Sequence, residues 1–390
     1  MSKHICIVLM DDPIYKQSSL RVADSLARAG YAVTMVGRRM GSGTGPSGVS
    51  RGGEAGRGTA NPVRQVRFVC LFRKGKASYA EMNIRIFFYL LLHRVDMVCA
   101  VNLDTILPCY VVSRLKDIPR LYDARELFTE MAEVVARPRI QKTWLWVERT
   151  MVPRFPRGYA VCLGIAEELQ RRYGVRYPVI RNMTVLQERH DLGAGGLGPV
   201  ADAGRRPLEG PYLLYQGAVN HGRGLDALMG AMRQIDLPLV ICGTGNYMGQ
   251  TVELVQRYGL SEKVVFTGQL KPEELRRYTD HAYIGINLVE REGFNQYYSL
   301  PNKLFDYIHS GVPQVTMDYP EYRRIQDEIE VAVLIADVTE EEIVQALRRL
   351  CDEPGLYNRL KEHCLEARKR LNWQAEEGKL FQDNLYVFPD

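Results

Sequence analysis

The sequence predicts an α/β protein with two doubly wound, Rossmann-like domains that face each other across a cleft. The chain has 390 residues, 46% of them hydrophobic, which is enough for two cores at about 100–200 residues per domain. Short apolar runs alternate with amphipathic segments along most of the chain, as in parallel sheets covered by helices. Residues 191–210 are polar, glycine-rich and without periodicity, so we expect a linker there.

The first predicted domain covers residues 1–195. It opens with a βαβ unit, in which an amphipathic segment ending at Gly30 joins two apolar runs. The first turn reads DDPIYKQ and contains no GxGxxG dinucleotide motif. Residues 41–62 are rich in glycine, serine and arginine but precede no apolar helix, so a flexible surface loop is favoured over a phosphate loop. The expected strands are 4–9, 32–36, 66–71, 96–101, 119–122 and 158–163, and the expected helices are 20–27, 78–94, 105–115, 144–152 and 166–173.

The second predicted domain covers residues 211–372 and repeats the alternation. A CGTG sequence at 242–245 follows a strand and is similar to a dinucleotide loop. The next strand, however, ends Thr267-Gly268-Gln269, without the acidic residue that would hold a ribose, so this reading is disfavoured. The expected strands are 212–215, 237–242, 264–267, 284–288 and 314–317, and the expected helices are 225–232, 251–258, 272–278 and one that begins near Pro301.

The helix that begins near Pro301 is the most informative element. In YYSLPNKLFDYIHSGVP, apolar residues recur every four positions and predict one buried side. Polar groups gather on its first turns: Ser299, Asn302, Lys303 and Asp306. A free helix N-terminus beside a cation suits phosphate, although an ordinary amphipathic helix remains an alternative.

Charge is divided unevenly along the chain. Residues 1–200 contain 30 Lys and Arg against 17 Asp and Glu, which gives +13, whereas residues 201–390 contain 21 against 29, which gives −8. A basic half suits an anionic substrate or the surface of an anionic membrane, and a solvated arginine-rich face is the alternative. Nucleic acid is disfavoured as a partner, because no helix-turn-helix, zinc-finger or RNP-like pattern occurs.

Cysteine spacing and hydropathy favour a cytoplasmic protein. The 8 cysteines are scattered without a CxxC pair, which indicates reduced thiols rather than disulfides or a zinc site. The first apolar run is too short for a secretory signal, and the longest one, 84–92, is interrupted by Arg85. A basic turn at Arg73, Lys74 and Lys76 next to an aromatic helix leaves open a peripheral contact with the inner face of a membrane.

Several stretches together resemble a known family. These are YQGAVNHGRGLDAL, LPLVICGTG, KVVFTGQLKPEELRRYTDHAYIGINL and SLPNKLFDYIHSGVPQVTMDYPE in the second half, with AVNLDTILP and LYDARELFTE in the first. The chain resembles retaining GT-B glycosyltransferases of the bacterial family 4 group (glycosyl transferases group 1), which build polysaccharides and glycolipids. The resemblance covers nearly the whole chain and implies an acceptor domain followed by a donor domain.

The resemblance also implies a donor site. Asp306 would bind the donor ribose, and the turn from Tyr298 to Pro301 would present amides to the diphosphate. Arg223 matches one member of the family's basic pair; the other is absent after Gly217, and we expect Lys303 to replace it as the second catalytic cation. The expected donor-binding residues are Gly217, Gly243, Tyr298, Ser299, Leu300, Asn302 and Asp306.

Two positions depart from the family pattern. Tyr298 stands where a glutamate that contacts the sugar is usual, while Glu290 and Glu292 lie nearby but out of register. In the first domain, Arg125 replaces a histidine found in many relatives, and a fixed cation is a poor base. We therefore assign Asp123, Arg125 and Glu126 to the acceptor side, as a charge-binding group or as a structural salt-bridge cluster. The family also implies that a C-terminal helix, here 373–390, packs back on the first domain.

These observations lead to one expected activity. The protein would move a sugar from a nucleoside diphosphate to a hydroxyl of a saccharide or lipid-linked acceptor, with retention of configuration. No DxD sequence occurs, so we expect no metal and no other cofactor. The alternatives are a GT-B-type nucleotide-sugar epimerase and a non-catalytic nucleotide-binding paralogue.

Overall fold

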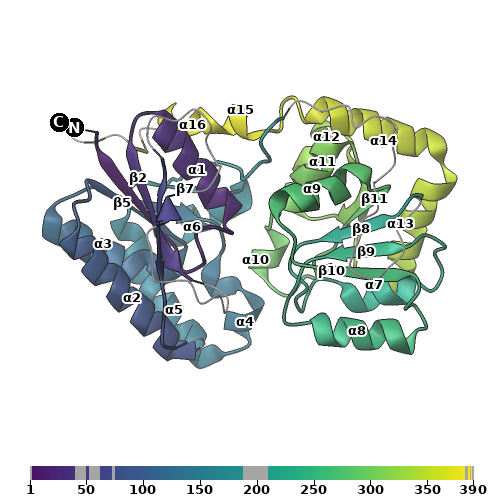
Figure 1. The fold of residues 1–390 in the computed structure, drawn as a ribbon, viewed down its shortest axis with the longest axis horizontal. Coiled ribbons are helices and arrows are strands. Elements are labelled where there is room, and N and C mark those ends of the chain that lie inside the picture. Colours follow the sequence, from purple (N-terminus) through teal and green to yellow (C-terminus); the bar gives the residue numbers. More distant parts are fainter. Residues whose placement is uncertain are drawn as a thin grey trace. The chain divides into compact units, whose positions relative to one another are not determined.

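The computed structural model describes residues 2–39, 50–51, 62–72, 75–187, 210–382, 385–386 and 388. They form two compact units, Met1–Arg181 with Glu376–Asp390, and Asn182–Ala375 (Figure 1). The boundary at Asn182 lies earlier in the chain than the predicted domain end at 195, because Asn182 and Thr184 bond to residues of the second unit. Most of the predicted loop 41–62 and all of the linker 191–210 except Gly210 lie outside the described residues.

The first unit is built on a seven-stranded sheet in the order β3-β4-β2-β1-β5-β6-β7. All of its strands run parallel except the short β3, which pairs antiparallel with β4. Every residue of the inner strand β5 is buried, as expected for a parallel strand covered on both faces. The strands are β1 (His4–Val8), β2 (Ala32–Arg38), β3 (Ser50–Arg51), β4 (Arg64–Phe68), β5 (Met97–Val101), β6 (Arg120–Ala124) and β7 (Gly158–Ala160).

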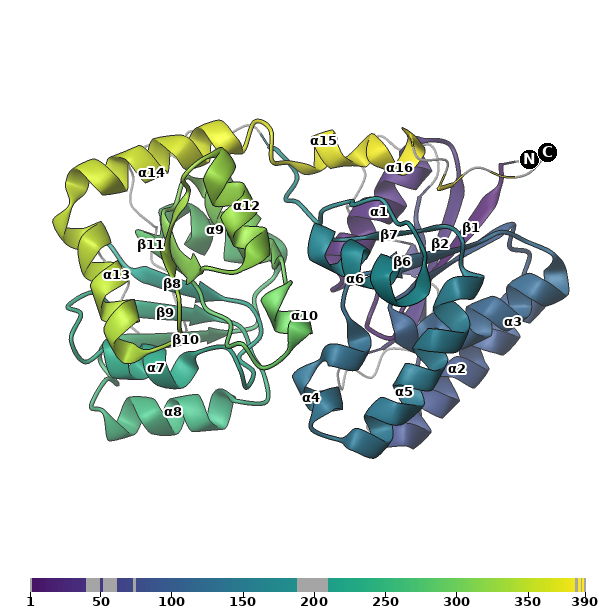
Figure 2. The same cartoon turned by 180° about the vertical axis from the view of Figure 1, so that it is seen from behind.

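Helices cover both faces of this sheet. Helix α2 packs against α3, and α3 packs against α5, so these three lie side by side in both views (Figures 1 and 2). The helices are α1 (Gln17–Arg28), α2 (Gly75–Leu92), α3 (Ile106–Lys116), α4 (Ala132–Val135), α5 (Pro138–Met151) and α6 (Leu163–Tyr173).

The C-terminal residues belong to the first unit. In the described part of the segment expected as one helix over 373–390, the chain forms two short helices, α15 (Trp373–Glu377) and α16 (Lys379–Gln382), separated by Gly378, a poor helix former. Glu377 accepts a 2.5 Å ion-pair contact from Arg28. Buried Tyr386 donates from its hydroxyl to Cys99 Sγ at 3.8 Å.

The second unit holds a six-stranded parallel sheet in the order β10-β9-β8-β11-β12-β13. Its strands are β8 (Leu213–Gln216), β9 (Leu239–Cys242), β10 (Val264–Gly268), β11 (Ile284–Asn287), β12 (Gln314–Met317) and β13 (Ala332–Ile335). Its helices are α7 (Leu225–Ala231), α8 (Met248–Arg257), α9 (Pro272–His281), α10 (Phe294–Tyr297), α11 (Asn302–Ser310), α12 (Pro320–Glu328), α13 (Glu340–Asp352) and α14 (Pro354–Ala367). The predicted α/β class with two doubly wound domains is confirmed.

Two further observations bear on the sequence predictions. All eight cysteines have free thiols. Within the described ranges, the helices are all too short or too polar to cross a bilayer.

Candidate active site

Each sheet has a point where the order of its strands reverses. In the second unit the chain runs from β8 outward to β10 and returns to β11 on the other side of β8. Ligands of open α/β sheets bind at such a point, beyond the carboxyl ends of the strands. Gly217 and Arg223 follow β8 there, Gly243 follows β9, and α11 follows β11.

Two glycines let the loops after β8 and β9 meet backbone to backbone. The Gly217 amide donates to Cys242 O at 2.9 Å. A Cβ atom at Gly243 would lie 1.8 Å from Gly217 O, closer than any real contact. Gly217 itself has φ +114°, which disfavours any side chain. Both predicted glycines therefore shape the floor of the site.

Glu290 fixes the loop that carries Arg223. Its carboxylate Oε1 accepts from the Gly224 amide at 3.0 Å, and its own amide donates to Gly222 O at 2.9 Å. Gly222 and Gly224 have φ +74° and +68°. Glu290 does not occupy the sequence position expected for contact with the sugar, and instead it holds the loop that carries Arg223.

Arg223 and Lys303 form a cationic pair. The Lys303 ammonium lies over the Tyr215 ring, 4.3 Å from its centroid. Burial and, second, the positive charge of Arg223 lower the pKa of Lys303 to about 7. Within the described part of the chain, no carboxylate forms a salt bridge with either side chain. Pro301 precedes α11 and offers no side-chain cap, so the helix N-terminus adds positive potential.

Asp306 is held by neutral partners. Its Oδ1 accepts from Thr184 Oγ1 at 2.6 Å and its Oδ2 from Gln216 Nε2 at 3.0 Å. Thr279 Oγ1 in turn donates to Gln216 Oε1 at 2.8 Å. These bonds fix the orientation of the carboxylate. Sequence reasoning missed Thr184 and Gln216, although Gln216 directly precedes the predicted Gly217.

The turn before α11 is aromatic where an acid was expected. The Tyr298 ring stacks on Phe294, with centroids 6.2 Å apart and planes at 13°. Ser299 Oγ donates to Gln296 O at 2.8 Å, and Leu300 is buried. Asn302 at the start of α11 accepts from Asn182 Nδ2 at 2.6 Å.

The predicted acceptor residues cluster after β6 in the first unit. Asp123 is 1% exposed, and its Oδ2 accepts from Arg125 Nε at 2.9 Å and from Nη2 at 2.5 Å. Arg125 Nη1 also donates to Ser18 Oγ. Burial alone would lower the pKa of Arg125, but the charge of Asp123 raises it above its usual value. Arg125 is therefore a permanently charged, buried partner of Asp123.

Asn102 joins this cluster in an unusual conformation. Its φ of 61° and ψ of 171° fall in a region that is essentially restricted to glycine. Its side chain accepts from the Arg125 amide at 3.2 Å and donates to Glu126 Oε2 at 3.4 Å. Two residues further on, burial and the nearby charges of Asp11 and Glu126 raise the pKa of Asp104 to about 8. Sequence reasoning quoted this segment for its resemblance but named neither residue.

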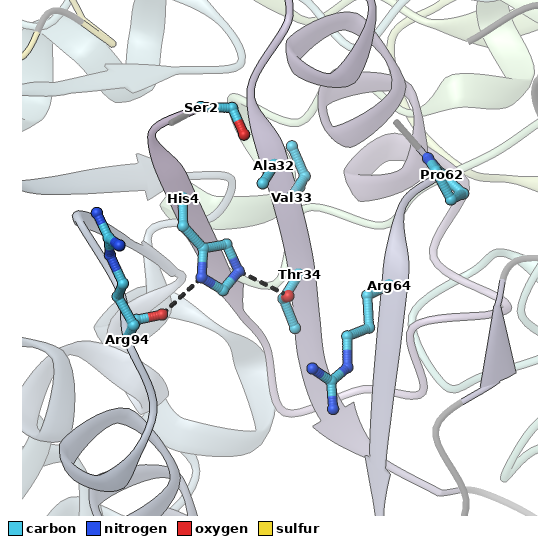
Figure 3. A pocket seen from close by; sticks show the side chains of 8 residues that line it. All are labelled: Ser2, His4, Ala32, Val33, Thr34, Pro62, Arg64 and Arg94. Carbon is cyan, nitrogen blue, oxygen red and sulfur yellow. Dashed lines mark hydrogen bonds between the residues drawn. The ribbon is translucent and has the colours of Figure 1, made fainter. Parts of the chain in front are cut away.

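A separate pocket of about 540 Å³ lies at the opposite, amino-terminal edge of the first sheet (Figure 3). His4 in its wall is fully bonded, with Nδ1 2.6 Å from Arg94 O and Nε2 2.8 Å from Thr34 Oγ1. Since ligands of parallel sheets bind at the carboxyl edge, we do not assign this pocket to the reaction.

The two doubly wound sheets and the cations at the carboxyl edge of the second sheet are typical of nucleotide-sugar transferases with two α/β domains. Residues 201–367 match the model of the family described as glycosyl transferases group 1. Most of the second unit is therefore similar to glycosyl transferases group 1.

Solved structures share the fold over the whole chain. The sucrose-phosphate synthase of Thermosynechococcus elongatus superposes with a TM-score of 0.74 at 18% identity, covering 98% of both chains. Anabaena HepE, in complex with UDP and glucose, gives 0.70 at 11% identity over 98% of this chain and 99% of that one. An E. coli trehalose-6-phosphate protein bound with UDP-2-fluoro glucose gives 0.68 at 11% identity over 100% of both. A search of curated protein sequences finds no match.

Proposed function

We propose that the protein transfers a sugar from a nucleoside diphosphate to an acceptor hydroxyl with retention of anomeric configuration and without a metal ion. One observation carries the proposal: Arg223 and Lys303 lie together at the carboxyl edge of the second sheet without a carboxylate partner among the described residues. Two adjacent cations repel each other, so an anion between them is the arrangement that balances their charge.

The departing diphosphate supplies that anion. As the bond to the sugar breaks, negative charge grows on the phosphate oxygens, and fixed positive groups stabilise it. Arg223 can donate through its planar guanidinium, Lys303 through its ammonium, and the first turn of α11 through backbone amides. We propose that these groups neutralise the negative charge of the departing diphosphate, in place of a metal ion.

We place the ribose and the sugar of the donor relative to the diphosphate. We assign Asp306 to the ribose hydroxyls, because Thr184 and Gln216 fix its carboxylate, which can accept hydrogen bonds from hydroxyl groups, at the carboxyl edge of the sheet. Tyr298, in the turn before α11, would border the sugar with an aromatic face. Two structural neighbours carry uridine nucleotides, which makes a UDP-sugar the first donor to test.

The cluster after β6 is our candidate for acceptor binding. The buried Asp123–Arg125 pair gives a rigid base, and Asn102, Asp104 and Glu126 offer hydroxyl-binding groups around it. The resemblance to polysaccharide- and glycolipid-building enzymes favours a saccharide or lipid-linked acceptor and a cytoplasmic location.

The test combines binding and product analysis. UDP, GDP and ADP are titrated first, and the matching nucleotide sugars are then incubated with and without candidate acceptors. Transfer with retention, unaffected by EDTA, is expected. Isomerised donor in the absence of acceptor would instead identify an epimerase, and no nucleotide binding at all would indicate a non-catalytic paralogue. Turnover abolished by EDTA and restored by manganese would refute metal independence.

Arg223→Gln tests the cation directly. A charged hydrogen bond contributes about 1.5–3 kcal/mol, so nucleotide affinity should fall roughly 10- to 150-fold, as measured by calorimetry. The melting temperature should stay constant, because no salt bridge in the described chain involves Arg223. Arg348→Gln, an exposed arginine on α13, is the matched control. Unchanged affinity in Arg223→Gln would contradict the assignment.

A further inference from the structure

Helix α2 exposes apolar residues on its outward side. Its inward side is formed by Met82, Ile86 and Leu90, all buried. On the outward side Ile84, Phe88 and Leu92 recur every four residues, and Leu92 is 76% exposed. A surface helix normally turns polar residues to water, and a helix that is apolar all round is normally buried all round. From Ile84 to Leu92, helix α2 is apolar on all sides apart from Arg85, and only its inward side is covered.

Helix α3 repeats this pattern beside it. Leu107, Val111 and Leu115 recur every four residues along the outward side, and Leu115 is 65% exposed. Because α2 and α3 pack together (Figures 1 and 2), their exposed rows belong to one layer of helices. We call them the α2–α3 patch: Ile84, Phe88, Leu92, Leu107, Val111 and Leu115.

Cations flank the patch. Helix α5 packs against α3, and its outward side presents Lys142, Trp146 and Arg149 at helical spacing, with Trp146 62% exposed. Arg114 is exposed on α3. None of these three cations forms a salt bridge within the ranges that the structure describes.

Acidic groups on the same helices offer little compensation. Glu81 is engaged with Arg85 Nη2 at 2.9 Å and with the amides of Leu71 and Phe72. Glu148 on α5 is buried, and Asp117 at the end of α3 is the exposed acid nearest to Arg114 in the sequence. The layer formed by α2, α3 and α5 therefore combines exposed apolar rows with a net positive charge.

We propose that the α2–α3 patch and the cations of α5 rest on an anionic lipid bilayer. Apolar side chains would enter the boundary between head groups and acyl chains, Trp146 would lie at the head-group level, and the cations would meet lipid phosphates. A second copy of the chain fits less well, because a two-fold contact would bring the cations of both copies together. This inference does not depend on the donor site.

Vesicle co-sedimentation of the full chain tests the proposal, with phosphatidylcholine vesicles compared with vesicles that also contain phosphatidylglycerol. Binding should require phosphatidylglycerol and weaken as salt screens the charges. At about 1 kcal/mol per cation near the surface, Lys142→Ala with Arg149→Ala should weaken binding roughly 30-fold. Phe88→Gln should weaken it roughly fivefold, since about half of a side chain worth about 1.5–3 kcal/mol is available for burial.

Matched controls distinguish vesicle binding by this face from a general effect of charge or hydrophobicity. Arg348→Ala and Phe294→Gln remove an equally exposed cation and aromatic ring from the second unit, and vesicle binding should be unchanged. Circular dichroism and thermal melting confirm that each variant is folded. The proposal is overturned by a lack of vesicle binding, by equal losses in the control variants, or by a dimer in solution that Phe88→Gln dissociates.

Discussion

Nucleotide binding should weaken as pH rises above neutrality, because Lys303 loses its proton there. In the unliganded protein, burial and the neighbouring Arg223 lower the pKa of Lys303 to about 7. A bound diphosphate would favour the charged ammonium and raise that pKa again. Affinity is therefore greatest where Lys303 is already protonated, and it declines as pH rises from the pKa of the free protein toward the pKa of the complex.

The size of the effect follows from the fraction of charged Lys303. With a pKa of about 7, about half of Lys303 is protonated at about pH 7 and about one hundredth at about pH 9, so affinity should fall by up to roughly 50-fold. The nucleotide contributes little in this window, because a terminal phosphate has its second pKa near about 6. Burial raises the pKa of Tyr215 to about 12, so the ring beneath Lys303 stays neutral.

Isothermal calorimetry of the diphosphate that binds is the assay. At about pH 8, heats measured in buffers of different ionisation enthalpy should reveal uptake of nearly one proton per nucleotide. Lys303→Arg, which stays charged throughout, should flatten the pH dependence while retaining affinity. Lys303→Met should bind weakly and show the same affinity at both ends of the range.

Two results would refute this reasoning. One is an affinity that is constant or rises between about pH 7 and about pH 9 in the native protein. The other is an unchanged pH dependence in Lys303→Met, which would place the titrating group elsewhere. The unliganded protein gives an independent check with the opposite sign. The difference in unfolding free energy between the native protein and Lys303→Met should shift in favour of the native protein as pH rises from about 7 to about 10, because Lys303 binds more protons in the unfolded chain there.

Two stability predictions test the framework of the two sites. Gly243→Ala would place a methyl group 1.8 Å from Gly217 O and should lower the free energy of unfolding by about 3 kcal/mol or more. Gly249→Ala, in α8 with open space around its Cβ, should instead raise it by up to about 1 kcal/mol, and equal effects would contradict the backbone contact. Arg125→Met should cost about 3–5 kcal/mol in urea unfolding, because Asp123 stays buried without its cation. A smaller loss in the double variant with Asp123→Asn would show that the uncompensated charge is the cause, and an additive loss would refute it.

Much of the fold could be predicted because it depends on local pattern. Apolar runs such as residues 96–101 specify buried parallel strands, and stop signals such as Gly30 and Gly311 mark helix ends. The bonding of Asn182 to Asn302 could not be predicted, because it depends on a contact between residues far apart in sequence.

The candidate site divides in the same way. The resemblance to the family was sufficient to name Arg223, Lys303 and Asp306, which lie in segments that follow β8 and β11 at the carboxyl edge of the second sheet. The groups that orient them, such as Gln216 and Glu290, act across 90 and 66 residues of sequence. No local sequence pattern distinguishes such a glutamine or glutamate from one that is exposed to solvent. The strained backbone conformation of Asn102 likewise cannot be predicted from the residues around it.

The C-terminal residues that complete the first unit also affect how the chain is made. Tyr386 is buried against Cys99, yet the whole of Asn182–Ala375 separates that residue from the rest of its unit. At about 5–20 residues per second, a ribosome needs roughly 10–40 s to cross the intervening segment. During that interval the nascent first unit exposes the surface that Tyr386 later covers, whereas the second unit is synthesised as one uninterrupted stretch. The second unit can therefore finish folding before the first, although its sequence comes later.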